Sequence, residues 1–282
     1  MKKAVIMITA ILMSAMAWGQ AQINTKKVKL SDFTQKITKV VLSGNDFMDS
    51  ALKDEVTLRW RISPYEFCTL EEFNSLKTSD DYYFLLSTNG QFKKDSGPTI
   101  QFLSLVKGGK GAENGIGDML EVVSMPIASA QFPSGREIAF LPAFLDIMQD
   151  YTLDSMEKDS NAYGGLGNYS SKILKSDDFR IVFSKDDLAV SLENIGDDTI
   201  NFGKEMVVTD ESEVDELLRS NAENTLVSYV VAPFEPQPGS FCYKMLIDTR
   251  NHKLYYFKRH RITKKDGAGF LANDLRRIYS AR

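Results

Sequence analysis

Segments typical of β-strands alternate with amphipathic segments of helical period along most of this chain. Short runs rich in Val, Ile, Tyr and Phe predict strands at residues 82–87, 100–106, 119–125, 180–183 and 226–231. Capping signals and periodic apolar residues predict helices between them. Because strands and helices interleave, we expect an α/β or α+β fold with helices packed on a mixed sheet, and neither a sandwich nor a helical bundle.

Two stretches, 40–64 and 207–233, resemble each other, and both have the pattern of strand, helix, strand. Each begins with a Val-Val pair and continues with an Asp-x-x-Leu helical core at Asp49 or Asp215. Each then ends with Thr-Leu leading into an aromatic-containing strand and a proline. A helix of about three turns has the length of a right-handed crossover between parallel strands. The pattern predicts two βαβ units, related by duplication or alike by chance.

Other helix starts are marked by capping signals. The spacing at 69–72 and at 210–213 is that of a capping box, a hydroxyl or Asp side chain followed three residues later by Glu. A further signal at Ser134 predicts a largely buried helix that runs towards Lys158. Pro142 either kinks this helix or is the first residue of a later start.

The N-terminus has the three parts of a secretory signal peptide. Lys2 and Lys3 form a positive region, residues 4–16 form an apolar run, and Ala17 and Ala21 offer cleavage sites. The run is shorter than the roughly twenty apolar residues that span a bilayer. We therefore expect a cleaved signal and a protein that is periplasmic or extracellular.

With residues 1–21 assigned to the signal peptide, residues 22–282 remain for the folded protein. This length suits a single mixed α/β domain, or two lobes with a boundary near 130–165. Charged residues interrupt every later apolar segment, so no transmembrane segment is expected after signal cleavage.

Charge is distributed unevenly along the chain. The segment 250–282 has ten Lys or Arg against two Asp, whereas 146–223 has nineteen Asp or Glu against seven Lys or Arg. Residues 241–262 predict a β-hairpin with its turn at 248–251, followed by a last helix. An extended strand at 253–262 places basic and aromatic residues together, which suits either an anionic ligand or an edge strand whose charge prevents aggregation. The candidate anion- or partner-binding residues are Lys258, Arg259, His260, Arg261, Lys264, Lys265, Arg276 and Arg277.

The chain shows no complete catalytic, metal-binding or cofactor-binding motif. The glycine-rich loop 108–117 lacks the Lys-Ser or Lys-Thr that a P-loop requires, and no Gly-x-Ser-x-Gly elbow occurs. The two histidines, His252 and His260, lack the spacing of a zinc site. We therefore expect no catalytic residue, no metal and no cofactor.

The sequence offers candidate residues for two kinds of covalent modification, a disulfide and O-glycosylation. Cys68 and Cys242 could form one disulfide in an oxidising compartment, or could be two buried thiols. Ser50, Ser155 and Thr199 each follow Asp and precede an apolar residue, a pattern that resembles the acceptor sites of O-glycosylation in some Gram-negative anaerobes.

The run 246–255, Leu-Ile-Asp-Thr-Arg-Asn-His-Lys-Leu-Tyr, resembles a hairpin of envelope assembly proteins related to the curli secretion lipoprotein and to penicillin-binding-protein activators. This resemblance implies a non-catalytic α/β envelope module. The whole chain is also similar to uncharacterised exported proteins of Gram-negative anaerobes. Such relatives carry no activity over to this chain.

The sequence thus favours an exported, non-catalytic binding or assembly module of the cell envelope. Its partner is unknown, and an anionic envelope glycan, a lipid head group or a protein are all compatible, whereas nucleic acid is not expected for an exported chain. The alternative is a hydrolase that acts on envelope or dietary polymers through a carboxylate pair assembled from distant positions.

Overall fold

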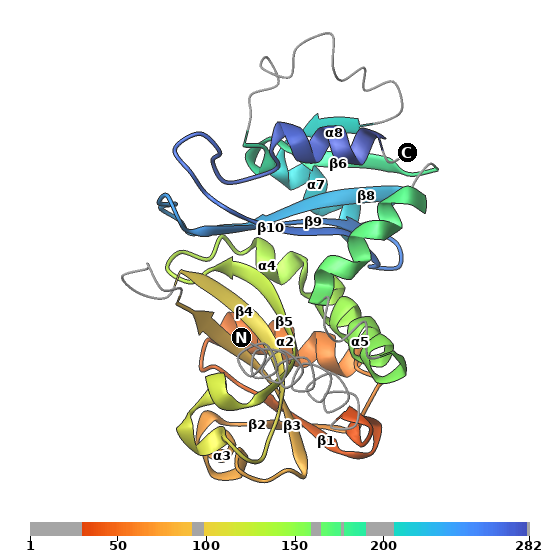
Figure 1. The fold of residues 1–282 in the computed structure, drawn as a ribbon. Helices are drawn as coiled ribbons and strands as arrows, with labels where there is room; N and C mark the ends of the chain where they lie inside the picture. Colours follow the sequence, from red (N-terminus) through yellow and green to blue (C-terminus); the bar gives the residue numbers. More distant parts are fainter. Residues whose placement is uncertain (1–29, 92–98, 159–164, 176–177, 190–205, 281–282) are drawn as a thin grey trace, which may run out of the picture.

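The fold consists of two five-stranded mixed sheets with helices packed on them. The α/β or α+β class expected from the sequence is therefore confirmed. Figure 1 shows the second sheet stacked above the first, with the chain passing between them through α4 (Arg136–Ala139) and α5 (Leu141–Glu157). The computed structural model describes residues 30–91, 99–158, 165–175, 178–189 and 206–280.

The first sheet has the strand order β2-β1-β3-β4-β5. β1 pairs in parallel with β2 and β3, and β4 and β5 continue the sheet in antiparallel fashion. In chain order its elements are β1 (Ile37–Val41), α2 (Asp46–Arg59), β2 (Tyr65–Cys68), α3 (Leu70–Leu76), β3 (Tyr82–Gly90), β4 (Ile100–Lys107) and β5 (Leu120–Ser129).

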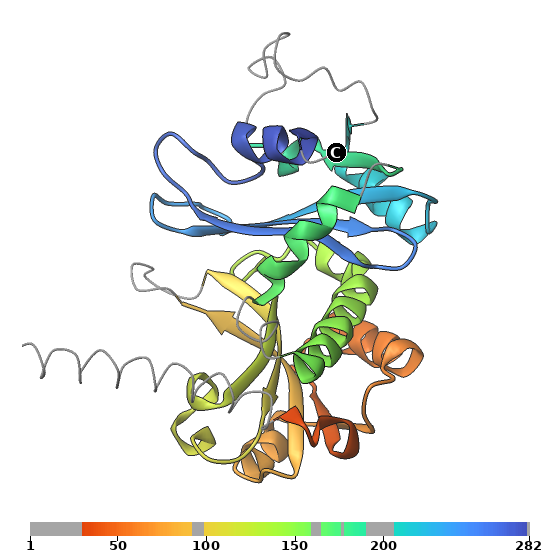
Figure 2. The same ribbon diagram turned by 45° about the vertical axis from the view of Figure 1, so that its right-hand side comes forward.

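The second sheet repeats this topology. β6 pairs in parallel with β7 and β8, and β9 and β10 continue in antiparallel fashion, so the order is β7-β6-β8-β9-β10. Its elements are β6 (Arg180–Ser184), β7 (Met206–Thr209), α7 (Glu211–Arg219), β8 (Thr225–Val231), β9 (Phe241–Asp248), β10 (Leu254–Arg261) and α8 (Ala272–Ser280). Both views show α8 on the side of this sheet that faces away from the first sheet (Figures 1 and 2).

A βαβ unit begins in each predicted stretch, β1-α2-β2 in the first and β7-α7-β8 in the second, but the two units occupy different places in their sheets. β1 and β2 pair directly, whereas β7 and β8 lie on either side of β6. By strand order, 207–233 therefore corresponds to β2-α3-β3 and not to 40–64. The strand expected after Thr57 is absent, because Leu52 and Val56 keep a buried helical face and α2 continues to Arg59.

The helix α5 is buried on most of its surface and packs against both sheets. Phe140 is followed by Leu141 and Pro142 in the first turn of α5, where a missing N–H breaks no helical hydrogen bond. The helix thus starts anew rather than kinking. Ile138, which lies within the range of the predicted buried helix, belongs instead to the separate short helix α4 and is 36% exposed.

Only one of the two predicted capping boxes forms. Thr69 Oγ1 accepts from the Glu72 N–H at 3.2 Å, and the Glu72 carboxylate accepts from the Thr69 N–H at 2.7 Å. Asp210 precedes α7, but its side chain caps nothing and accepts instead from Lys185 Nζ at 2.9 Å. An ion pair has replaced the expected cap.

The five strands and the C-terminal hairpin expected from the sequence are confirmed, and no strand end differs from its predicted position by more than four residues. In β10, side chains alternate between the two faces from Tyr256 onward, so Phe257 and Arg259 face the first sheet while the Lys258 side chain reaches Asp274 of α8. A β-bulge between Leu254 and Tyr256 breaks the earlier alternation and places Leu254 in the same core as Phe257.

Within the described residues, no helix is both long enough and apolar enough to cross a bilayer. The expected signal peptide at 1–21 and the candidate glycosylation residue Thr199 lie outside the described residues.

Candidate functional site

A cleft of about 670 Å³ lies between the two sheets, where β5 of the first sheet faces β9 and β10 of the second. Its third wall comes from η4, a 3₁₀ segment (Gly165–Lys175) that runs along β10. Phe102 and Glu121 line it from the first sheet, and Tyr243, Phe257 and Arg259 line it from the second.

Aromatic rings form the floor of this cleft. Tyr243 packs edge-on against Phe102 with ring centroids 5.7 Å apart, and against Phe257 at 6.1 Å. Tyr243 is only 6% exposed, so burial raises the pKa of its phenol, although a hydrogen bond from Arg259 acts in the opposite direction. The cleft therefore offers a fixed apolar floor with a cationic group at its edge.

Arg259 and Arg261 are held side by side on one aromatic ring. Their guanidinium carbons lie 4.5 Å and 4.4 Å from the centroid of Phe241. Arg261 also donates to the Gly239 carbonyl at 3.1 Å. Within the described chain neither arginine forms an ion pair with a carboxylate. Two positioned, exposed guanidinium groups without an anionic partner favour binding of an external anion.

The other predicted binding residues do not join this pair. Lys258 and His260 lie on the opposite face of β10, where Lys258 donates to Asp274 at 2.6 Å and His260 Nε2 contacts the Gly267 carbonyl at 2.9 Å. Lys264 and Lys265 are exposed in the turn after β10, and Arg276 and Arg277 are exposed on α8. The four candidates in β10 divide between its two faces because alternate strand residues face opposite sides, and the other four lie outside the strand.

Under α8, Asp274 binds two lysines and a tyrosine. Lys244, which is fully buried, forms an ion pair with Asp274, and the Tyr256 hydroxyl donates to the same carboxylate at 2.9 Å. Burial alone would raise the pKa of Asp274, but hydrogen bonds from Lys244 and Lys258 outweigh it and lower the pKa to about 2. Burial lowers the pKa of Lys244 despite the same ion pair. Lys258 thus stabilises the fold of the hairpin against α8.

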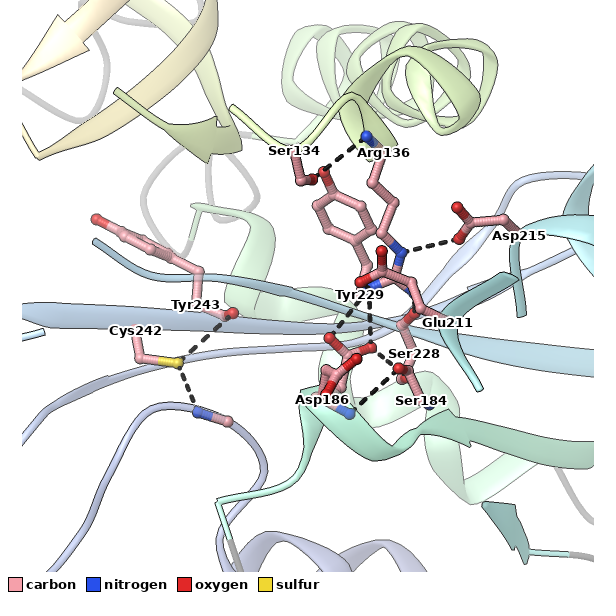
Figure 3. A network of polar contacts seen from close by, with 12 residues as sticks. Ser134, Arg136, Ser184, Asp186, Glu211, Asp215, Ser228, Tyr229, Cys242 and Tyr243 are labelled. Carbon is pink, nitrogen blue, oxygen red and sulfur yellow. Dashed lines mark hydrogen bonds and ion pairs between the residues drawn. The ribbon is translucent and has the colours of Figure 1, made fainter. Parts of the chain in front are cut away.

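A second buried polar network surrounds Arg136 at the start of α4 (Figure 3). Its guanidinium donates to Asp215 at 2.8 Å, to Asp187 at 3.1 Å and to the Ser228 carbonyl at 3.0 Å. Glu211 lies 3.6 Å from the same guanidinium. The network joins the segment after the first sheet to β8, to α7 and to the turn after β6.

This carboxylate cluster is more consistent with a structural role than with hydrolysis. Asp187, Asp215 and Arg136 are 3%, 7% and 6% exposed, which leaves substrate little access. Burial raises the pKa of Asp187, while Arg136 and Ser228 act in the opposite direction. In the cleft itself, Glu121 is the one carboxylate among the described lining residues, so the pair that the hydrolase alternative requires is not assembled there.

A larger hollow of about 810 Å³ lies beside Trp60, Arg61 and Tyr65. Arg61, its charged residue, already donates to the carbonyls of Thr57 and Trp60 at 3.3 Å and 2.8 Å. These bonds provide hydrogen-bond donors for backbone carbonyls at the C-terminal end of α2, which have no partner within the helix. Arg261 makes one such bond, to the Gly239 carbonyl, and Arg259 makes none to a carbonyl within the described chain. We therefore prefer the cleft as the binding site, because two exposed arginines lie beside its aromatic floor.

The two cysteines are separate buried thiols, Cys68 at the end of β2 and Cys242 in β9. They belong to different sheets, which does not support the candidate disulfide. Of the candidate glycosylation residues, Ser50 is exposed on α2, whereas Ser155 is 1% exposed within α5. A glycan at Ser155 would have no space in the folded protein, and that candidate is withdrawn.

Comparisons with protein-family models, with curated proteins and with solved structures return no match for this chain. The function must therefore be argued from the site itself. Sequence reasoning missed Phe102, Glu121, Tyr243 and Phe241 as parts of that site. The signal for Phe241 and Tyr243 was present, because a hairpin centred on 248–251 brings them opposite Arg261 and Arg259.

Proposed function

We propose that this chain is an exported, non-catalytic binding module that holds an anionic ligand in the cleft between its sheets. The observation that carries the proposal is the pair Arg259 and Arg261, positioned on Phe241 beside an aromatic floor and without a carboxylate partner in the described chain. Clefts of several hundred Å³ with apolar walls and a few convergent polar groups are typical ligand sites.

Export is part of the proposal and rests on the N-terminal sequence. The chain should reach the periplasm or the exterior after cleavage at Ala17 or Ala21. Fractionation of the native host followed by N-terminal sequencing tests this. An uncleaved chain that remains in the cytosol would contradict it.

Binding can be tested on a heparin column, which presents a dense polyanion. The protein has a formal charge of −4, so retention requires a local cationic site rather than bulk attraction. We expect the double variant Arg259→Gln with Arg261→Gln to elute at clearly lower salt than the native protein, with the same melting temperature within about 2 °C.

Two matched variants control for total charge. Lys264→Gln with Lys265→Gln, and Arg276→Gln with Arg277→Gln, remove the same two charges from exposed positions outside the cleft. Both should elute close to the native protein. If either control lost as much retention as the Arg259 and Arg261 variant, binding would reflect general charge and the cleft would not be the site.

A further inference from the structure

Along the arginine pair, no described segment of the chain pairs with the outer edge of β10. In an antiparallel ladder, alternate residues direct both backbone groups towards the same neighbour. Ile262 exchanges hydrogen bonds with Ser240 and Gly239, at 2.8 Å each, so even-numbered residues here face β9. The odd-numbered residues Arg259 and Arg261 therefore direct their N–H and C=O groups away from the sheet.

Phe257, another odd-numbered residue, also directs its backbone groups away from β9, and it lies where the unpaired part of the edge ends. Its N–H donates to Ser170 Oγ at 2.9 Å, and the Ser170 hydroxyl donates to its carbonyl at 2.7 Å. Ser170 belongs to η4, which occupies the outer side of β10 at this point. For Arg259 and Arg261, the described chain provides no backbone hydrogen bond on the outer side. β10 is also the last strand of its sheet.

From this edge we propose that the ligand is an extended acidic peptide segment of a partner protein, which adds to the second sheet as a strand beside β10. The inference rests on the proposed function and names its ligand. Strand addition supplies main-chain hydrogen bonds, and alternate side chains enter neighbouring pockets. Side chains on the cleft side of the added strand would meet Arg261 and then Arg259. The peptide would leave the edge before Phe257, whose outer backbone groups Ser170 already binds, and would pass over the aromatic floor of the cleft.

The order of the arginines and the aromatic floor along β10 determines which peptide sequence would bind there. An acidic residue is favoured opposite each arginine, and an aromatic or apolar residue is favoured after them, where the peptide leaves the edge and passes over Phe257 and Tyr243. The same charges repel a basic or a second identical edge, so they oppose self-association while they admit an acidic strand. A glycan or a lipid head group could pair with the arginines but would leave the outward backbone groups unused.

The test uses the mature protein and a fluorescent probe peptide, Glu-Thr-Glu-Thr-Phe-Thr-Glu-Thr-Glu, whose palindromic order allows either strand direction. Two further probes carry N-methyl groups, on the Glu amides in one and on the Thr amides in the other, with the charge unchanged. We expect saturable binding of the parent peptide, at least about tenfold weaker binding of one methylated probe, and a similar loss with Arg259→Gln and Arg261→Gln.

Amide hydrogen exchange measured by NMR gives a second, independent readout. The amides of Lys258 and His260 should exchange slowly with or without peptide, whereas those of Arg259 and Arg261 should exchange rapidly in the free protein and become protected on binding. Slow exchange at Arg259 and Arg261 before any peptide is added would overturn the open edge.

The outcomes separate the two proposals. If the arginine variant loses heparin retention but all three probes bind alike, or none binds, the anion site stands and strand addition is wrong. If neither heparin nor peptide depends on Arg259 and Arg261, both proposals fail.

Discussion

The Tyr229 hydroxyl donates a hydrogen bond of 2.5 Å to the Ile127 carbonyl, and this bond joins β8 of the second sheet to β5 of the first. β5 is the last strand of its sheet, so its outer backbone groups need partners from elsewhere in the molecule. The Tyr229 ring packs on Phe140 and Phe144, with centroids 4.4 Å and 5.2 Å apart. One side chain thus contributes both a polar and an apolar contact between the two halves.

We expect Tyr229→Phe to lower the free energy of unfolding by about 1–2 kcal/mol, because a buried carbonyl loses its partner while the ring contacts remain. Urea denaturation followed by fluorescence measures this loss. Tyr279→Phe is the matched control, since Tyr279 is 43% exposed and should change stability by less than about 0.5 kcal/mol. Equal effects of the two substitutions would contradict the role assigned to the Tyr229 hydroxyl.

Removal of the Arg136 guanidinium should be far more damaging. Arg136→Met leaves Asp187 and Asp215 buried without their cation, and we expect a loss of about 3–5 kcal/mol at neutral pH. The loss should shrink as the pH falls towards 5, because a protonated carboxyl is less costly to bury. Arg219→Met, which removes an exposed ion pair with Glu216, should cost less than about 1 kcal/mol. A pH-independent deficit in Arg136→Met would argue against unpaired carboxylates as its cause.

Periodicity was sufficient to predict the strands, the helix α5 and the C-terminal hairpin, because each has a local pattern that its burial reinforces. It could not predict that two sheets form, because pairing between distant strands depends on contacts that no local window contains. For the same reason, the stretch 207–233 was matched to the wrong strands of the first sheet. A Val-Val pair is favourable in a parallel strand whatever its place in the sheet, and both β1 and β7 carry one.

The candidate site was predicted only in part. Arg259 and Arg261 were identified because basic and aromatic residues alternate in one strand, and the structure places them together on Phe241. Lys258 was grouped with them, although it faces Asp274 across the strand. The Arg136 network was missed entirely, because its carboxylates lie 51 and 79 residues away along the chain.

Asp274 predicts a specific acid sensitivity. Its pKa of about 2 in the folded protein lies below the ordinary 3.8, so the folded state releases this proton more readily than the unfolded chain. The resulting stability is fully present above about pH 4 and is lost as the pH falls towards 2. Asp274→Asn should therefore flatten the pH dependence of unfolding in that interval, besides lowering stability at neutral pH by at least about 2 kcal/mol. Glu223→Gln, which removes a carboxylate from an exposed ion pair, is the matched control. A variant at Asp274 with the native acid profile would show that its carboxylate is not the group that titrates.

The two thiols should be unreactive in the folded protein and available after unfolding. Burial raises the pKa of Cys242 to about 11 and also raises the pKa of Cys68, and thiolate is the form that reacts with disulfide reagents. Ellman's reagent should therefore titrate both thiols in denaturant but react only slowly with the native protein. Ser50→Cys is the positive control, because its exposed position on α2 should add one rapidly reacting thiol. Absence of free thiols in denaturant under non-reducing conditions would instead indicate the disulfide, and would require the two sheets to approach each other differently.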